Sequence, residues 1–236
     1  MKRAGWMHNK EGDKTMRRLL LTLGVVGLAL AMGSPAFADQ VYDLTVPNSQ
    51  LSGYSGNTFG TVDVQWVSLT TANITFTADT GFLFTDSSAA DVNVNATSFS
   101  LSNLTGTKLA GFSGPELSNG GSGQVDGFGR FNQTINEHDS FTYALETISF
   151  TLTDISGTWG DAGSVLRANS KGAFVAAHMG ACGLAPDSSP CSINTSFGSN
   201  TGYVSQGGAR VPEASSGALL GMLLGAGALF RRRLTT

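Results

Sequence analysis

The sequence predicts an all-β protein: an antiparallel β-sandwich, jelly-roll-like in arrangement, with an N-terminal signal peptide and a C-terminal transmembrane helix. Short segments alternate apolar and polar residues, most clearly at 147–153, where Ile148, Phe150 and Leu152 are the apolar members. This period of two is the pattern of half-buried strands. Clusters of Gly, Ser, Asn and Asp separate the segments, and no stretch between 39 and 190 has a convincing helical period. Closely spaced short strands divided by turns are typical of sandwiches and jelly rolls.

The expected strands fall into two sets. Residues 41–46 form the first strand, which Pro47 ends, and four or five more strands lie within 61–104. The second set lies within 128–152. A glycine-rich break at 117–129 separates the two sets, and residues 120–126 within it are expected to be a flexible loop.

The domain is expected to cover residues 39–195. Near its end, 164–178 suits either a pair of strands or one short helix. Residues 196–210 are rich in Gly, Ser and Asn and contain few apolar side chains. We expect this last segment to be a flexible spacer between the domain and the C-terminal tail.

The first 38 residues have the pattern of a secretory signal peptide. A basic pair precedes an apolar run at 19–32, and Ala36 and Ala38 form a small-x-small cleavage site. This order of basic, apolar and small residues predicts export through the Sec translocon and a mature chain that begins at Asp39. Met16 directly precedes the basic pair and is an alternative start of translation.

The last 26 residues, 211–236, have three parts in fixed order. Val211, Pro212, Glu213 and Ala214 form a short signature, 214–230 is an uncharged stretch rich in Ala, Leu and Gly, and the basic residues Arg231, Arg232 and Arg233 follow. Seventeen residues of helix are about 25 Å long, at the lower limit of what spans a bilayer. The arginines are expected to stay on the cytoplasmic side. The tail therefore predicts insertion into the inner membrane.

This tail resembles the PEP-CTERM sorting domain of proteins exported by Gram-negative bacteria that make exopolysaccharide. Val211, Pro212 and Glu213 match the usual Val-Pro-Glu-Pro, and Ala214 replaces the second proline. The resemblance implies that an exosortase, a membrane-embedded processing enzyme, recognises the tail and removes it near the Pro-Glu pair. The protein would then be released to the cell surface or the extracellular matrix. Retention as an uncleaved anchor is the alternative.

The charge of the mature region argues against nucleic acid as a partner. Residues 39–210 contain 5 Lys and Arg against 14 Asp and Glu, a formal net charge of −9. Nucleic-acid binding needs a basic surface that neutralises phosphates. The acidic balance identifies no partner by itself, because mild acidity chiefly favours solubility.

Cys182 and Cys191 are the two cysteines of the chain. In an exported protein a close pair predicts a disulfide. The alternative is a catalytic thiol at Cys182 assisted by His178, four residues earlier, but a catalytic thiolate also needs an orienting partner that the sequence does not supply. We therefore expect a disulfide and no catalytic residue.

Signals for a ligand or a metal are weak. Trp159 lies among glycines, so it is the best candidate for an exposed aromatic ring that binds sugar. Calcium held by loop carboxylates such as Asp79, Asp86 and Asp91 is an open alternative, since such sites need only oxygen ligands. The mature region has only two histidines, which excludes a histidine-rich metal site, and no cofactor is expected.

Three functions remain for the mature domain. The leading one is a non-enzymatic structural or adhesive role linked to exopolysaccharide and biofilm. The second is a carbohydrate-binding module within the matrix. The third is a hydrolase or lyase that acts on polysaccharide, because paired carboxylates can come from any of the acidic residues.

Overall fold

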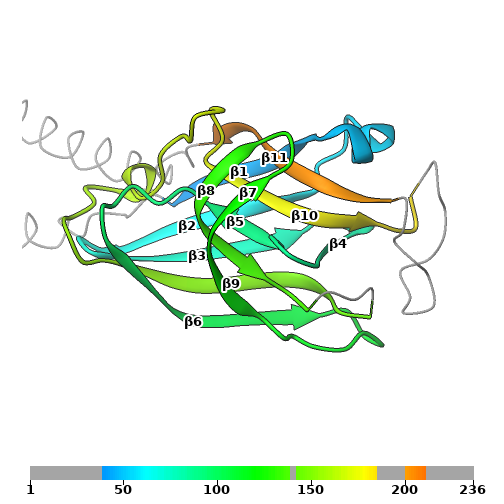
Figure 1. Cartoon of the computed structure of the whole chain (residues 1–236), viewed down its shortest axis with the longest axis horizontal. Coiled ribbons are helices and arrows are strands. Elements are labelled where there is room, and N and C mark those ends of the chain that lie inside the picture. The colour runs from blue at the N-terminus through cyan, green and yellow to red at the C-terminus, as the bar shows by residue number, and fades with distance from the viewer. Residues whose placement is uncertain (1–38, 139–141, 185–199, 211–236) are drawn as a thin grey trace, which may run out of the picture. The chain divides into compact units, whose positions relative to one another are not determined.

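The computed structural model describes residues 39–138, 142–184 and 200–210, and these residues form antiparallel strands with two short 3-10 helices (Figure 1). Contacts divide the chain into 1–36 and 37–236, and only the second unit contains described residues. The elements are β1 (Gln40–Pro47), η1 (Ser49–Tyr54), β2 (Gly60–Ser68), β3 (Thr71–Ala78), β4 (Phe82–Thr85), β5 (Ala90–Val92), β6 (Phe99–Lys108), β7 (Ser118–Val125), β8 (Gly129–Asn136), β9 (Ala144–Asp154), η2 (Ala162–Ser164), β10 (Val175–Ala181) and β11 (Thr201–Arg210).

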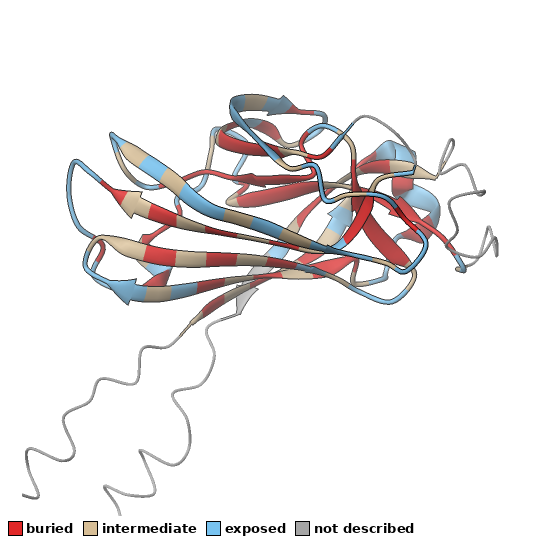
Figure 2. Cartoon of the chain, turned by 90° about the horizontal axis from the view of Figure 1, so that it is seen from below, coloured by how far each residue is buried: buried red, intermediate tan, exposed pale blue. Residues whose placement is uncertain are grey.

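The alternating segments of the sequence are strands, which confirms the prediction of an all-β antiparallel domain. Buried and more exposed residues alternate along β1, β2, β3 and β9 (Figure 2). Val62, Ile74 and Ile148 point to the interior and are fully buried. Their polar neighbours lie on the outer face, where Ser149 donates to Thr75 Oγ1 at 3.2 Å. One face of each strand therefore supplies the core, and the other carries the Ser and Thr that dominate the composition.

The strands close on themselves, which corrects the predicted jelly-roll-like sandwich. Hydrogen-bonded neighbours run in the order β11-β1-β2-β3-β9-β4-β10, and β10 pairs with β11 again, so seven strands form a closed barrel. Strands β5, β8 and β7 branch from β10, and β6 branches from β9. Alternation shows which face of a strand is buried, but it does not show which strand lies at each edge. The closure was therefore not visible in the sequence.

Residues 201–210 are a strand, so the prediction of a flexible spacer at 196–210 is wrong for that part. Strand β11 lies between β1 and β10, with Val41 opposite Arg210 and His178 opposite Tyr203. Val204 is fully buried. A strand with neighbours on both edges satisfies its backbone groups by pairing, so it needs few apolar side chains. Residues 196–199 lie outside the described residues.

The glycine-rich segment that we expected to be a flexible loop is strand β7, paired with β8. Its glycines permit a close approach to β8. A Cβ atom on Gly120 would lie 2.5 Å from Thr134 Oγ1, and one on Gly123 would lie 2.6 Å from Thr134 Cγ2. The β7–β8 hairpin packs over β10, where Phe131 and Ala176 belong to a second small core.

Candidate functional site

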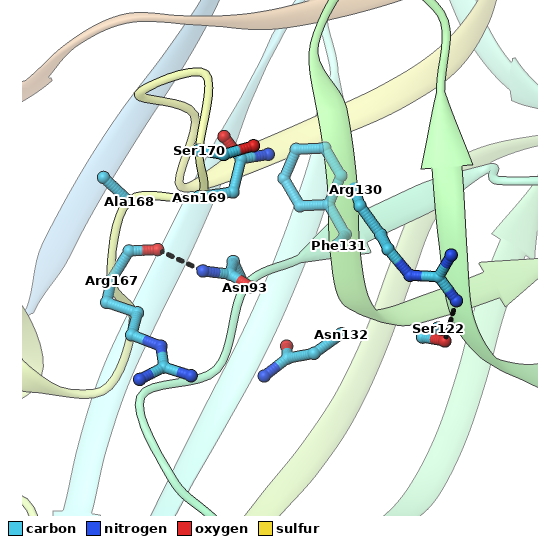
Figure 3. A pocket seen from close by; sticks show the side chains of 9 residues that line it. All are labelled: Asn93, Ser122, Arg130, Phe131, Asn132, Arg167, Ala168, Asn169 and Ser170. Atoms are coloured by element: carbon cyan, nitrogen blue, oxygen red, sulfur yellow. Dashed lines mark hydrogen bonds between the residues drawn. The ribbon is translucent and has the colours of Figure 1, made fainter.

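An open pocket of about 420 Å³ lies between the β7–β8 hairpin and the loop at 167–170 (Figure 3). Most of the residues that line it have polar or charged side chains, and none of them is a carboxylate. The residues that line it are Asn93, Ser122, Arg130, Phe131, Asn132, Arg167, Ala168, Asn169 and Ser170.

Side-chain amides hold the walls of this pocket in place. Asn132 donates to the carbonyl of Val94 at 2.9 Å and accepts from the Val94 N–H at 2.7 Å. Asn93 donates to the carbonyl of Arg167 at 2.9 Å, so it ties the 167–170 loop to the strand side of the pocket. Asn169 donates to the carbonyl of Phe128 at 2.9 Å. These bonds join three separate chain segments, so the pocket is preformed.

The guanidinium groups of Arg130 and Arg167 are the charged groups of the pocket. Arg130 Nη2 donates to Ser122 Oγ at 2.9 Å. Both arginines are exposed, and within the described ranges neither has a carboxylate at ion-pair distance. In Figure 3 the amide of Asn132 lies between the two guanidinium groups. The pocket therefore presents several unused N–H donors to solvent.

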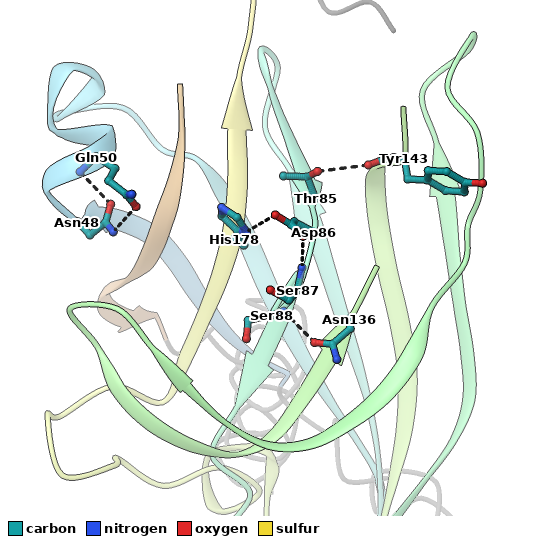
Figure 4. A network of polar contacts seen from close by, with 9 residues as sticks. All are labelled: Asn48, Gln50, Thr85, Asp86, Ser87, Ser88, Asn136, Tyr143 and His178. Atoms are coloured by element: carbon teal, nitrogen blue, oxygen red, sulfur yellow. Dashed lines mark hydrogen bonds and ion pairs between the residues drawn. The ribbon is translucent and has the colours of Figure 1, made fainter. Parts of the chain in front are cut away.

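A second polar cluster lies around His178 on β10 (Figure 4). His178 Nδ1 is 3.9 Å from Asp86 Oδ2, and its ring stacks on Tyr203 with centroids 4.5 Å apart. Asp86 and Ser88 have φ angles of 64° and 56°, a left-handed conformation that is uncommon outside glycine. The turn is held by Ser88 N–H, which donates to Asn136 Oδ1 at 2.9 Å.

Asp91, on β5 near this cluster, is completely buried. Neither of its carboxylate oxygens has a partner with hydrogen-bond geometry. Burial raises the pKa of Asp91 well above its usual value, and the side chain of Ser88 offsets only part of that rise. Burial also raises the pKa of Tyr203, and the negative charges of Asp91 and Asp86 add to it.

The structure moves the predicted sugar-binding residue into the core. Trp159 is 1% exposed, and its indole N–H donates to the carbonyl of Asn95 at 3.0 Å. The expectation of an exposed ring was therefore wrong, because the glycines beside Trp159 mark a loop that folds inward. Trp66, on β2, is half-buried and packs against the main core.

The calcium alternative receives no support from the side chains around the three aspartates. Asp79 accepts from Thr80 N–H at 2.8 Å in a turn of its own, whereas Asp86 accepts from Ser87 N–H at 2.9 Å. No group of three or more His, Cys, Asp or Glu residues that could hold a metal ion occurs within 39–138, 142–184 and 200–210.

Most of the predicted processing residues lie outside the described part of the chain. These are Ala36, Ala38, Val211, Pro212, Glu213, Ala214, Arg231, Arg232 and Arg233. Asp39 is the first described residue. Cys182 is buried and disulfide-bonded, while Cys191 lies outside the described residues, so their pairing stays a prediction. None of the described helices has the length and apolar character that a membrane crossing requires.

Sequence reasoning missed the arginine-lined pocket. The one feature of the sequence that pointed to this pocket is the distribution of charge. Three of the five basic residues in 39–210 lie in or beside it: Arg130, Arg167 and Lys171. The pocket side chains come from separate segments that are joined only by the fold. No protein family, curated protein or solved structure matches this chain.

Proposed function

We propose that this chain is an exported surface or extracellular-matrix protein with a non-enzymatic structural or adhesive role linked to exopolysaccharide. The Sec translocon would export it, and an exosortase would process its C-terminal tail at the inner membrane. The signal-peptide pattern and the Val-Pro-Glu tail support this proposal, and the pairing of β1 with β11, in which Val41 lies opposite Arg210, fits it.

Because β1 and β11 are paired, the two proposed cuts would both fall beside the same end of the domain. The expected signal-peptide cut before Asp39 lies just ahead of β1, and the Val-Pro-Glu signature begins directly after β11. Both cuts would leave every strand pair intact. Before the second cut, a tail that leaves from Arg210 would tether the domain without unfolding β11. The strand ends therefore fit a domain that is first anchored and then released.

The sorting part of this proposal is tested by substituting the signature in the native host. The double variant Pro212→Ala and Glu213→Ala should accumulate in the membrane fraction with its tail attached. The matched control is Ala214→Pro, which restores the usual second proline and should be released as well as the parent chain. Release of the double variant at the parental level would contradict exosortase-type sorting.

A second candidate function is carbohydrate binding within the matrix, and the pocket is the observation that favours it. Hydroxyl, amide and guanidinium groups line an open cavity with fixed walls. Sites of this kind, with a few placed polar groups, are typical of small-ligand recognition. Trp159 is not part of such a site because its ring is in the core. Binding of saccharides to the full chain, measured by titration calorimetry, tests this function.

A further inference from the structure

We propose that the pocket binds an acidic saccharide through Arg130 and Arg167. This inference rests on the proposed carbohydrate-binding function and names its ligand class: a sugar unit that carries a carboxylate. The guanidinium groups would pair with carboxylates of the saccharide, and the serine side chains at the rim would meet neighbouring hydroxyls.

Positive charge is concentrated at this pocket. The region 39–210 carries 14 acidic and only 5 basic residues, yet two of the five basic residues line this pocket. A third, Lys171, follows the lining residue Ser170 and is exposed. No carboxylate lines the pocket. An acidic domain would repel an acidic polymer over most of its surface, so this local excess of positive charge directs an anion to one place.

Most of the guanidinium donors are left for a ligand, whereas the side-chain amides already have partners. The amide of Asn132 both donates to and accepts from the backbone of Val94, and that of Asn93 donates to the carbonyl of Arg167. Arg130 donates to Ser122, which fixes the position of the guanidinium and leaves further N–H groups for a ligand. Arginine pairs with carboxylates through two parallel hydrogen bonds, which lysine cannot do.

The arginine side chains are not needed for the fold. Arg167 contributes its backbone carbonyl to the bond with Asn93, and its side chain is exposed. Arg130 is also exposed, on the outer side of β8. Replacing either guanidinium by a neutral amide therefore leaves the wall bonds of Asn93, Asn132 and Asn169 in place. This separation of roles lets binding be tested without unfolding the domain.

The test is titration calorimetry of the full chain, purified in detergent, with three probes. The probes are oligomers of a uronic acid, neutral glucan oligomers of equal length, and inorganic phosphate. The variants are Arg130→Gln and Arg167→Gln. Lys108→Gln is the matched control, because it removes the same charge from β6, away from the pocket. Thermal unfolding of each variant checks that the fold is retained.

The expected result is that uronic acid oligomers bind, and that each arginine variant weakens their binding by about tenfold or more. Lys108→Gln should stay within about twofold of the parent. Equal weakening by Lys108→Gln would overturn the proposal, since it would indicate unspecific charge attraction. If neutral glucan oligomers bind and neither arginine substitution weakens that binding, the proposal of an acidic ligand is wrong, while carbohydrate binding is retained as a function. Binding of phosphate alone, or of no probe, would overturn both.

Discussion

Replacing Trp159 by alanine should destabilise the domain severely, because the ring is part of the core. Trp159 is 1% exposed, so nearly all of its side-chain area is removed from water on folding. An aromatic side chain buries about 150–250 Å², which at about 25 cal/mol per Å² corresponds to about 4–6 kcal/mol. Tryptophan-to-alanine changes in cores cost about 3–5 kcal/mol. We expect Trp159→Ala to lower the free energy of unfolding by about 4 kcal/mol.

The assay is urea unfolding followed by circular dichroism, since the substitution removes a fluorescent ring. Trp159→Phe is the companion variant: it keeps an aromatic ring in the core but loses the hydrogen bond to the Asn95 carbonyl. Trp159→Phe should lower the free energy of unfolding by about 1–2 kcal/mol. A change of less than about 1 kcal/mol for Trp159→Ala would refute the buried placement. If Trp159→Ala instead lost sugar binding with an unchanged free energy of unfolding, the ring would be a sugar-binding residue.

Three further predictions concern backbone packing, a buried acid and the disulfide. Gly60→Ala should cost about 1–3 kcal/mol in urea unfolding, because its new Cβ would meet the Thr77 carbonyl oxygen. Gly160→Ala, which has open space, is the control, and equal stability of the two variants would contradict the close approach. The raised pKa of Asp91 means that the folded state keeps its proton to higher pH, so stability falls as pH rises through that pKa. Asp91→Asn should remove this fall, which begins as pH rises above about 3.9, the usual aspartate pKa, and an unchanged profile of unfolding midpoints would contradict it. Reducing the disulfide of Cys182 should lower stability by about 2–3 kcal/mol, measured by urea unfolding with and without reductant, and no change would argue against a structural disulfide.

Local patterns predicted the strands well and their connections poorly. The alternation at 147–153 and 61–66 corresponds to β9 and β2, because a strand with one buried face must place apolar residues at every second position. Closure of the barrel depends on which strand edges meet, and β10 meets β4, β5 and β11 at residues far apart in the chain. That information is not local, so the sandwich prediction missed it.

Two strands contain few apolar residues, and for that reason they were not predicted as strands. Thr201–Arg210 was expected to be a spacer, yet pairing with β1 and β10 satisfies its backbone. The glycines of β7 were expected to make a loop, but at Gly120 and Gly123 the absence of a side chain is what lets β7 approach β8. In both strands the backbone pairing comes from neighbours, so the side chains alone carry a weak signal.

The candidate pocket was hidden for a related reason. Arg130 and Arg167 are 37 positions apart in the sequence and belong to no short motif. They line the same cavity because the β7–β8 hairpin and the 167–170 loop are tied to the same part of the sheet by Asn132 and Asn93. Only the scarcity of basic residues elsewhere in the domain pointed to this region.

The most direct test of the proposed function is mass spectrometry of the protein from its host, with membrane and culture-medium fractions analysed separately. Export and sorting predict that the released protein begins at Asp39 and ends close to Pro212 or Glu213, directly after β11. The membrane fraction should contain the precursor with its tail. An intact Arg231–Arg233 terminus found only in membranes, with no protein in the medium, would contradict release and leave a C-terminally anchored protein.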